Sequence, residues 1–140
     1  MNIIRSIVMF ALVMTATLPT LPMIETEDLD GTFHWKRVPI PATYSAEDHA
    51  QMSFNYFFQN GTYSVPKDVE VLEVRITDGL LMVDVTESIL DYGGSSFEIA
   101  LVTQLKKIAS EVPGIDRFTL RVEGLLQPLA YGTEIYREIL

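Results

Sequence analysis

Acidic side chains in the middle of the chain are the first candidates for chemistry, and four lie close together in sequence: Asp84, Glu87, Asp91 and Glu98. Carboxylate oxygens are the ligands that hard cations such as Ca²⁺ prefer, but the spacing of these four matches no calcium-binding loop. Glu98 follows Ser95 by three residues, which is the pattern of a capping box at the start of a helix. We therefore expect structural roles for these carboxylates and no metal site.

Asp84 has a second explanation in the strand expected beside it. A two-residue type I′ turn at Asp78-Gly79 would place Glu73 opposite Asp84, as a like-charge pair. Arg75, or Arg121 on a neighbouring strand, could neutralise that pair without a metal. We therefore expect Asp84 on an exposed, charged face of a sheet.

Two histidines and two short motifs are the remaining candidates. His34 and His49 could act as general bases, but neither has a nucleophile at a recognised spacing. Residues 93–96 (Gly-Gly-Ser-Ser) could bind an anion on free N–H groups, yet they lack the lysine and spacing of a phosphate loop. Residues 60–62 (Asn-Gly-Thr) match the glycosylation sequon only as a tripeptide. We expect no catalytic residue and no cofactor.

The composition is that of one globular domain. The chain has 140 residues, of which 48% are hydrophobic and 21% charged, and it has no cysteine. The absence of cysteine excludes a disulfide framework, a thiolate metal site and an acylated lipobox. A net charge of −9 argues against nucleic-acid binding and against adhesion to an anionic membrane surface.

The first residues have the pattern of a leader. Met1 to Arg5 is positively charged, residues 6–18 are mostly apolar, and Pro19 and Pro22 would end a helix. We expect residues 1–22 to be a signal peptide or an N-terminal membrane anchor, the only contact with a membrane, and residues 23–140 to be one exported domain. The alternative is a buried first strand of a cytosolic domain.

The hairpin around Asp78-Gly79 predicts its own register. Three apolar pairs would face the core: Ile76 with Leu81, Val74 with Val83, and Leu72 with Val85. A shift of one residue would bury the charged residues of the other face, so the pattern specifies this pairing.

Helical and strand patterns surround this hairpin. Ser45 and Asp48 form a capping-box pattern before an apolar stripe in helix 45–59, and Asn60-Gly61 predicts a left-handed exit. A second stripe, ended by Pro113-Gly114, consists of Phe97, Leu101, Leu105, Ile108 and Val112. Residues 32–38 and 117–123 alternate as strands, and another strand is expected near Leu125. The prediction is an α+β two-layer sandwich with a β-α-β-β-α-β core, a mainly antiparallel sheet and both helices on one face.

Several short motifs also occur in a fixed order along the chain: Pro66, Asp78-Gly79, Val83-Asp84, Gly93-Gly94-Ser95 with Glu98, Val112-Pro113-Gly114, and Val122-Glu123-Gly124. Together with the elements from Phe33 to Gly61, this order resembles the GerMN domain, a family named for a bacterial sporulation and spore germination protein. The resemblance implies a fold similar to ring-building motifs and an extracytoplasmic module without enzymatic activity.

The resemblance implies a structural or interaction protein of the bacterial cell envelope, linked to sporulation or spore germination, which assembles with a protein partner or with itself. A polar, switchable interface is expected on five charged residues of the outer sheet face: Glu73, Arg75, Arg117, Arg121 and Glu123. The alternative is a small-ligand-binding protein with an apolar pocket under the aromatic helix 45–59. The helical spacing of Phe54, Phe57 and Phe58 favours core packing of these rings.

Overall fold

The computed structural model describes residue 21 and residues 24–27, 33–40 and 44–140. The predicted leader therefore lies outside the described residues, except for Leu21. Within these ranges, no helix combines the length and the apolar character that crossing a membrane requires.

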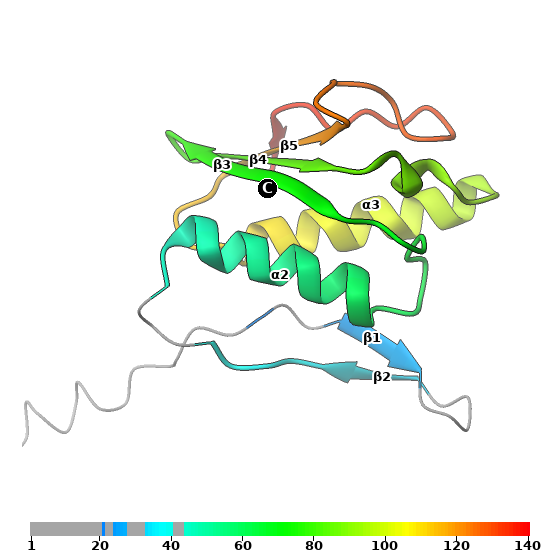
Figure 1. Ribbon diagram of the computed structural model, residues 1–140, viewed down its shortest axis with the longest axis horizontal. Coiled ribbons are helices and arrows are strands. Elements are labelled where there is room, and N and C mark those ends of the chain that lie inside the picture. Colours follow the sequence, from blue (N-terminus) through cyan, green and yellow to red (C-terminus); the bar gives the residue numbers. More distant parts are fainter. Residues whose placement is uncertain (1–20, 22–23, 28–32, 41–43) are drawn as a thin grey trace, which may run out of the picture.

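The main sheet has four strands in the order β3-β4-β5-β6. β3 (Val71–Thr77) is antiparallel to β4 (Leu80–Val85), β4 is parallel to β5 (Arg117–Val122), and β5 is antiparallel to β6 (Glu138–Ile139). The parallel pair requires a crossover, which is made by the 3₁₀ helix η1 (Glu87–Leu90) and by α3 (Ser95–Ser110). Both α2 (Ala46–Asn60) and α3 lie on the same side of this sheet (Figure 1). The predicted α+β arrangement is confirmed.

The N-terminal strands form a sheet of their own. β1 (Ile24–Glu27) and β2 (Phe33–Lys36) pair as an antiparallel hairpin, which contacts α2 and lies on the far side of that helix from the main sheet (Figure 1). The strand expected at 32–38 is thus present but does not join the main sheet. The fourth strand of the main sheet is β6 instead. Near Leu125, where another strand was predicted, there is an isolated bridge to Val122.

The central hairpin has the predicted turn. Asp78 and Gly79 have φ angles of 49° and 77°, as a type I′ turn requires. Two of the three predicted apolar pairs are confirmed, but a bulge between Val71 and Glu73 places Val71 opposite Val85. Leu72, predicted to face the core, is 48% exposed for this reason.

The two helix starts differ in how well the sequence predicted them. At α2, the Ser45 hydroxyl accepts from the Asp48 N–H and the Asp48 carboxylate accepts from the Ser45 N–H, so this capping box is confirmed. At α3, Ser95 is already helical, the residue before it is Gly94 with φ 99°, and no side chain caps the helix. The predicted capping role of Glu98 is therefore wrong, because its carboxylate is turned into the protein.

The predicted left-handed exit at Gly61 is also wrong, since its φ is −68°. A side chain is excluded there by space, because a Cβ would lie 2.7 Å from the Phe57 carbonyl oxygen and 2.9 Å from the Val65 side chain.

The core lies between the main sheet and the two helices. Both predicted helical stripes contribute to it, and the rings of Phe54 and Phe118 stack with centroids 5.7 Å apart. The largest fully buried side chains are Phe54, Phe57, Phe118, Leu81, Ile89, Leu101, Leu105, Ile108, Glu98, Val83 and Val85. Glu98 is the one ionisable side chain among them, and a charge is costly to bury unless it is hydrogen-bonded.

The bulge can be tested with a matched pair of substitutions. Val83→Asp should unfold the domain, because it places an unpaired charge in the core. Leu72→Asp, on the same hairpin, should cost less than about 1 kcal/mol, because this side chain faces solvent. Urea denaturation followed by circular dichroism would measure both, and equal losses in the two variants would contradict the bulged register.

Candidate functional site

Asp84 is buried, which corrects the prediction of an exposed position. Its side chain is 7% exposed, and Oδ1 accepts a 2.9 Å hydrogen bond from the Gly124 N–H. Glu123 and Gly124, with φ angles of 50° and 78°, form a tight turn that is closed by two hydrogen bonds between Val122 and Leu125. The hairpin pattern in the sequence predicted only the residue opposite Asp84 on β3. The turn that covers Asp84 comes from the end of β5, which that pattern does not include.

Glu98 is the second buried carboxylate, and it holds the C-terminal segment. It accepts from the Tyr92 hydroxyl at 2.5 Å and from the Tyr131 and Thr133 N–H groups at 2.6 and 2.9 Å. Burial alone would raise the pKa of Glu98, but the hydrogen bonds from Thr133, Tyr92 and Tyr131 outweigh it, so the pKa lies below its ordinary value. Burial and the bond to this carboxylate raise the pKa of Tyr92. Glu98 is therefore ionised and structural.

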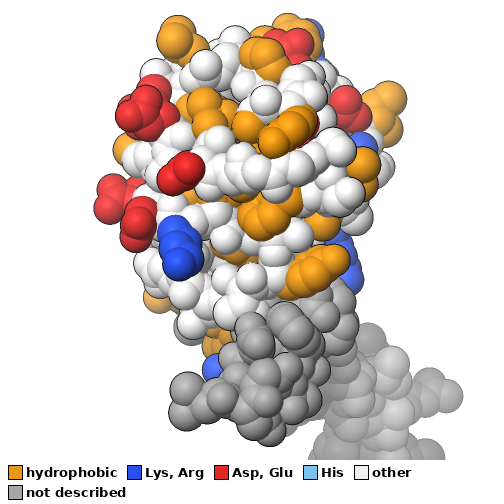
Figure 2. All heavy atoms as spheres, turned by 90° about the vertical axis from the view of Figure 1, so that its right-hand side faces the viewer, with side chains coloured by type: hydrophobic (Ala, Val, Ile, Leu, Met, Phe, Trp, Pro, Cys, Tyr) orange, Lys and Arg blue, Asp and Glu red, His pale blue; other side chains and the backbone are white. Residues whose placement is uncertain are grey.

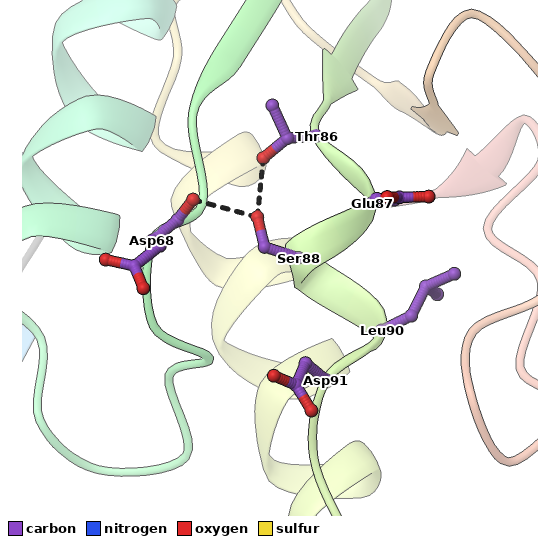
Figure 3. A pocket seen from close by; sticks show the side chains of 6 residues that line it. All are labelled: Asp68, Thr86, Glu87, Ser88, Leu90 and Asp91. Atoms are coloured by element: carbon purple, nitrogen blue, oxygen red, sulfur yellow. Dashed lines mark hydrogen bonds between the residues drawn. The ribbon is translucent and has the colours of Figure 1, made fainter.

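The other two acidic candidates line an open cavity of about 640 Å³ at the end of β4 (Figure 3). Its lining comprises Asp68, Thr86, Glu87, Ser88, Leu90 and Asp91. The Ser88 hydroxyl bonds to the Thr86 hydroxyl and to the Asp68 carbonyl, while the side chains of Asp68 and Glu87 point away from this pair. The described part of the chain holds no group of three or more His, Cys, Asp or Glu residues that could bind a metal.

The end of the molecule that carries this cavity is shown in Figure 2. Acidic side chains stand there at several separate places, with hydrophobic side chains between them. This distribution is that of a solvated acidic surface, in keeping with the net charge of −9.

The histidines do not form a catalytic pair. His34 is exposed on β2, whereas His49 is buried in α2. The His49 Nδ1 lies 3.3 Å from the Ser53 hydroxyl, but Ser53 is fully buried in the same helix. A substrate cannot reach that hydroxyl, so the contact is a structural one.

The aromatic side chains of α2 fill the core. Phe54 and Phe57 are fully buried, as their spacing predicted. A cavity of about 520 Å³ touches the carboxyl end of this helix, where Phe58 and Gln59 meet residues 65–70.

Four of the five residues of the predicted interface lie along one face of β3 and β5, on the side of the sheet that the helices leave uncovered, and Glu123 lies in the turn that follows β5. Arg75 is 71% exposed and lies 2.6 Å from the Glu73 carboxylate. Arg121 is exposed, whereas the Arg117 guanidinium is tied to the Asp78 carbonyl at 2.6 Å. Glu123 accepts from the Glu87 N–H at the far end of β5. Three of the five therefore stand at the surface on the central part of the face: Arg121, and Glu73 and Arg75 as an exposed ion pair.

A cavity of about 400 Å³ occupies this outer face, and three arginines line it. Cross-strand register explains why they meet: Arg75 faces Met82 on β4, and Met82 faces Thr119 on β5. The Thr119 hydroxyl accepts from the Arg137 N–H at 2.9 Å, which brings a third arginine to the end of the same row. The full lining is Arg75, Thr77, Leu80, Met82, Thr119, Arg121, Tyr136 and Arg137.

Sequence reasoning missed Tyr136 and Arg137, because the predicted elements end near Leu129. The available signal was weak: an aromatic residue followed by a basic one in a short segment without a strand or helix pattern. Their position depends on the return of the chain to β5, where the Leu120 N–H donates to the Ile135 carbonyl and β6 pairs with Arg117 and Phe118.

The role of Glu98 can be tested by its pH dependence. The pKa of Glu98 is lower in the folded protein than the value of about 4.3 expected for an unfolded chain. Its contribution to the free energy of unfolding is therefore complete above about pH 4.3 and is lost as the pH falls below that value. Glu98→Gln should cost about 2 kcal/mol at pH 7. The difference in free energy of unfolding between this variant and the parent chain, measured by urea denaturation, should become smaller below about pH 4. Glu134→Gln, an exposed change in the same segment, is the control, and a difference that stays constant with pH would contradict the proposed ionised state.

The contact of Asp84 predicts an order of stabilities. Asp84→Ala should cost about 1–3 kcal/mol, because it leaves the Gly124 N–H without its acceptor. Asp84→Asn should cost less, because the amide oxygen can still accept that bond. Denaturation midpoints at pH 7 would check this, and an alanine variant as stable as the asparagine variant would show that the bond contributes nothing.

Comparison with known proteins places the fold. The family model Germane, described as sporulation and spore germination, matches residues 28–128. Among solved structures, the first GerMN domain of the sporulation protein GerM from Bacillus subtilis has a TM-score of 0.61 at 22% identity, covering 89% of this chain and 97% of that one. The tandem GerMN domains of the same protein give 0.56 at 24% identity, covering 84% of this chain and 45% of that one.

A third structure, of a candidate lipoprotein from Clostridium perfringens, has a TM-score of 0.59 at 13% identity, covering 86% of this chain and 85% of that one. No curated protein matches the sequence. The family match spans most of the chain. The chain therefore belongs to the Germane family of sporulation and spore germination, and its domain is GerMN-like.

Proposed function

We propose that this chain is a non-enzymatic, extracytoplasmic interaction module of the bacterial cell envelope that assembles with a protein partner or with itself. The observation that carries the proposal is the outer face of the main sheet. The helices cover the opposite face, and on the outer one Arg75 and Arg121 line a cavity at the surface, with Glu73 paired to Arg75. A charged, hydrated surface of this kind suits a reversible contact better than a permanent one.

The contacts of the candidate catalytic groups support a non-enzymatic role. The carboxylates of Asp84 and Glu98 are engaged by backbone N–H groups, and Ser53 is fully buried beside His49. Each has a structural partner that accounts for it, so none is left over for acid–base or nucleophilic work.

The family and the leader pattern support the location. Residues 1–22 have the charged and apolar regions of an export signal or anchor, and one similar structure is described as a candidate lipoprotein. This chain has no cysteine, so its attachment would depend on the N-terminal segment and not on an acylated thiol. The family name ties the proposed role to sporulation or spore germination.

The interface is tested by charge reversal on the outer face. The double variant Arg75→Glu and Arg121→Glu should fold, because both side chains are exposed, and should lose cross-linking to its partner in envelope extracts. Lys67→Glu, an exposed change away from the outer-face cavity, is the control and should retain it.

Light scattering of the purified chain separates self-association from a different partner. A strict monomer under all conditions, together with envelope extracts that yield no cross-linked protein, would overturn the proposed assembly.

A further inference from the structure

The charged residues that line the outer-face cavity are all arginines, and Asp84, the cross-strand neighbour of Arg121, already accepts a hydrogen bond from the Gly124 N–H. The chain has 19 acidic and 10 basic residues, yet three arginines meet here and no acidic residue lines the cavity. Positive charges that lie close together repel one another, and an anion bound between them would offset this electrostatic repulsion.

Two of the three guanidinium groups have no partner. Within the described ranges, neither Arg121 nor Arg137 has a hydrogen bond or salt bridge to its guanidinium group. Arg75 is paired with Glu73, but that pair is mostly exposed, and an exposed pair contributes little and exchanges readily. All three are thus available to a ligand.

The geometry directs them to one place. Arg75, Met82 and Thr119 stand side by side on three adjacent strands, which lie about 4.8 Å apart, and Arg137 lies beyond Thr119. Arg75 stands at one end of this row, Arg137 at the other and Arg121 beside it, and all three line the same cavity. The Thr119 and Tyr136 hydroxyls lie in the same lining.

The backbone at Arg137 is fixed by a neighbour of the cavity. Its φ of 50° lies in the left-handed region, which residues other than glycine and asparagine seldom adopt, and the hydrogen bond from its N–H to the Thr119 hydroxyl holds it there. This bond therefore fixes the point from which the Arg137 side chain leaves the backbone.

We propose that this cavity binds a compact ligand with two or more oxyanion groups, phosphate or carboxylate, and that Arg75, Arg121 and Arg137 are its binding residues. The guanidinium fork bonds both kinds of group in pairs. The volume of about 400 Å³ lies at the small end of the range for ligand sites. This inference goes beyond assembly, because it concerns a small ligand on the isolated chain.

Calorimetric titration of the purified chain with pyrophosphate and with citrate tests the proposal, with NaCl adjusted to equal ionic strength. Saturable binding of either probe is expected, and the stronger of the two identifies the phosphate or the carboxylate class. Arg121→Gln and Arg137→Gln should each weaken binding about tenfold or more. Lys67→Gln, which removes an exposed positive charge elsewhere, should leave it unchanged.

Arg121→Lys keeps the positive charge but loses the paired N–H donors of the guanidinium group. Its affinity for the probe should therefore lie between those of the parent chain and of Arg121→Gln. Both arginines are exposed, so the variants should fold, which circular dichroism verifies. Binding no stronger than the salt control, or equal weakening by Lys67→Gln, would overturn the proposal. Loss of anion binding with cross-linking intact, or the reverse, separates this site from the proposed interface.

Discussion

The carboxylate of Glu98 is the contact on which the C-terminal segment of this domain, after β5, depends. It leaves the surface of α3 and accepts the N–H groups of Tyr131 and Thr133, which belong to a segment without regular secondary structure. A buried charge is tolerated when several donors satisfy it, and here the donors are supplied by the segment itself. The segment is thereby held against the helix, and the residues that follow it can return to β5, where Ile135 and Arg137 bond to Leu120 and Thr119.

Asp84 plays a similar part at the other face of the sheet. Its bond to Gly124 ties the turn after β5 to the carboxyl end of β4. Two pieces of the family signature, Val83-Asp84 and Val122-Glu123-Gly124, therefore touch each other, and a third, the glutamate of the glycine-serine motif, holds the next segment. Three of the motifs that carry the family resemblance are thus folding contacts, and this explains how a signature can be specific for a fold.

We propose that the function belongs to the surface that those contacts leave open. With the helices on one side of the main sheet, the outer side presents charged residues at its edges and an arginine-lined cavity near its middle. On a chain with a net charge of −9 this is a local reversal of sign, and such a reversal can select an anionic partner or ligand.

The sequence by itself determined the elements whose rules are local. The turn at Asp78-Gly79 and the cap at Ser45 follow from the chemistry of a few adjacent residues, and the buried stripes of both helices follow from periodicity. Only the tertiary structure decided where Glu98, Asp84 and Arg137 lie, because their hydrogen-bond partners, apart from Tyr92, are between 18 and 40 positions away in the chain. A carboxylate three residues after a serine satisfies the capping pattern equally well whether it bonds backward to its own helix or inward to a distant loop. That choice depends on which N–H groups the rest of the fold brings within reach.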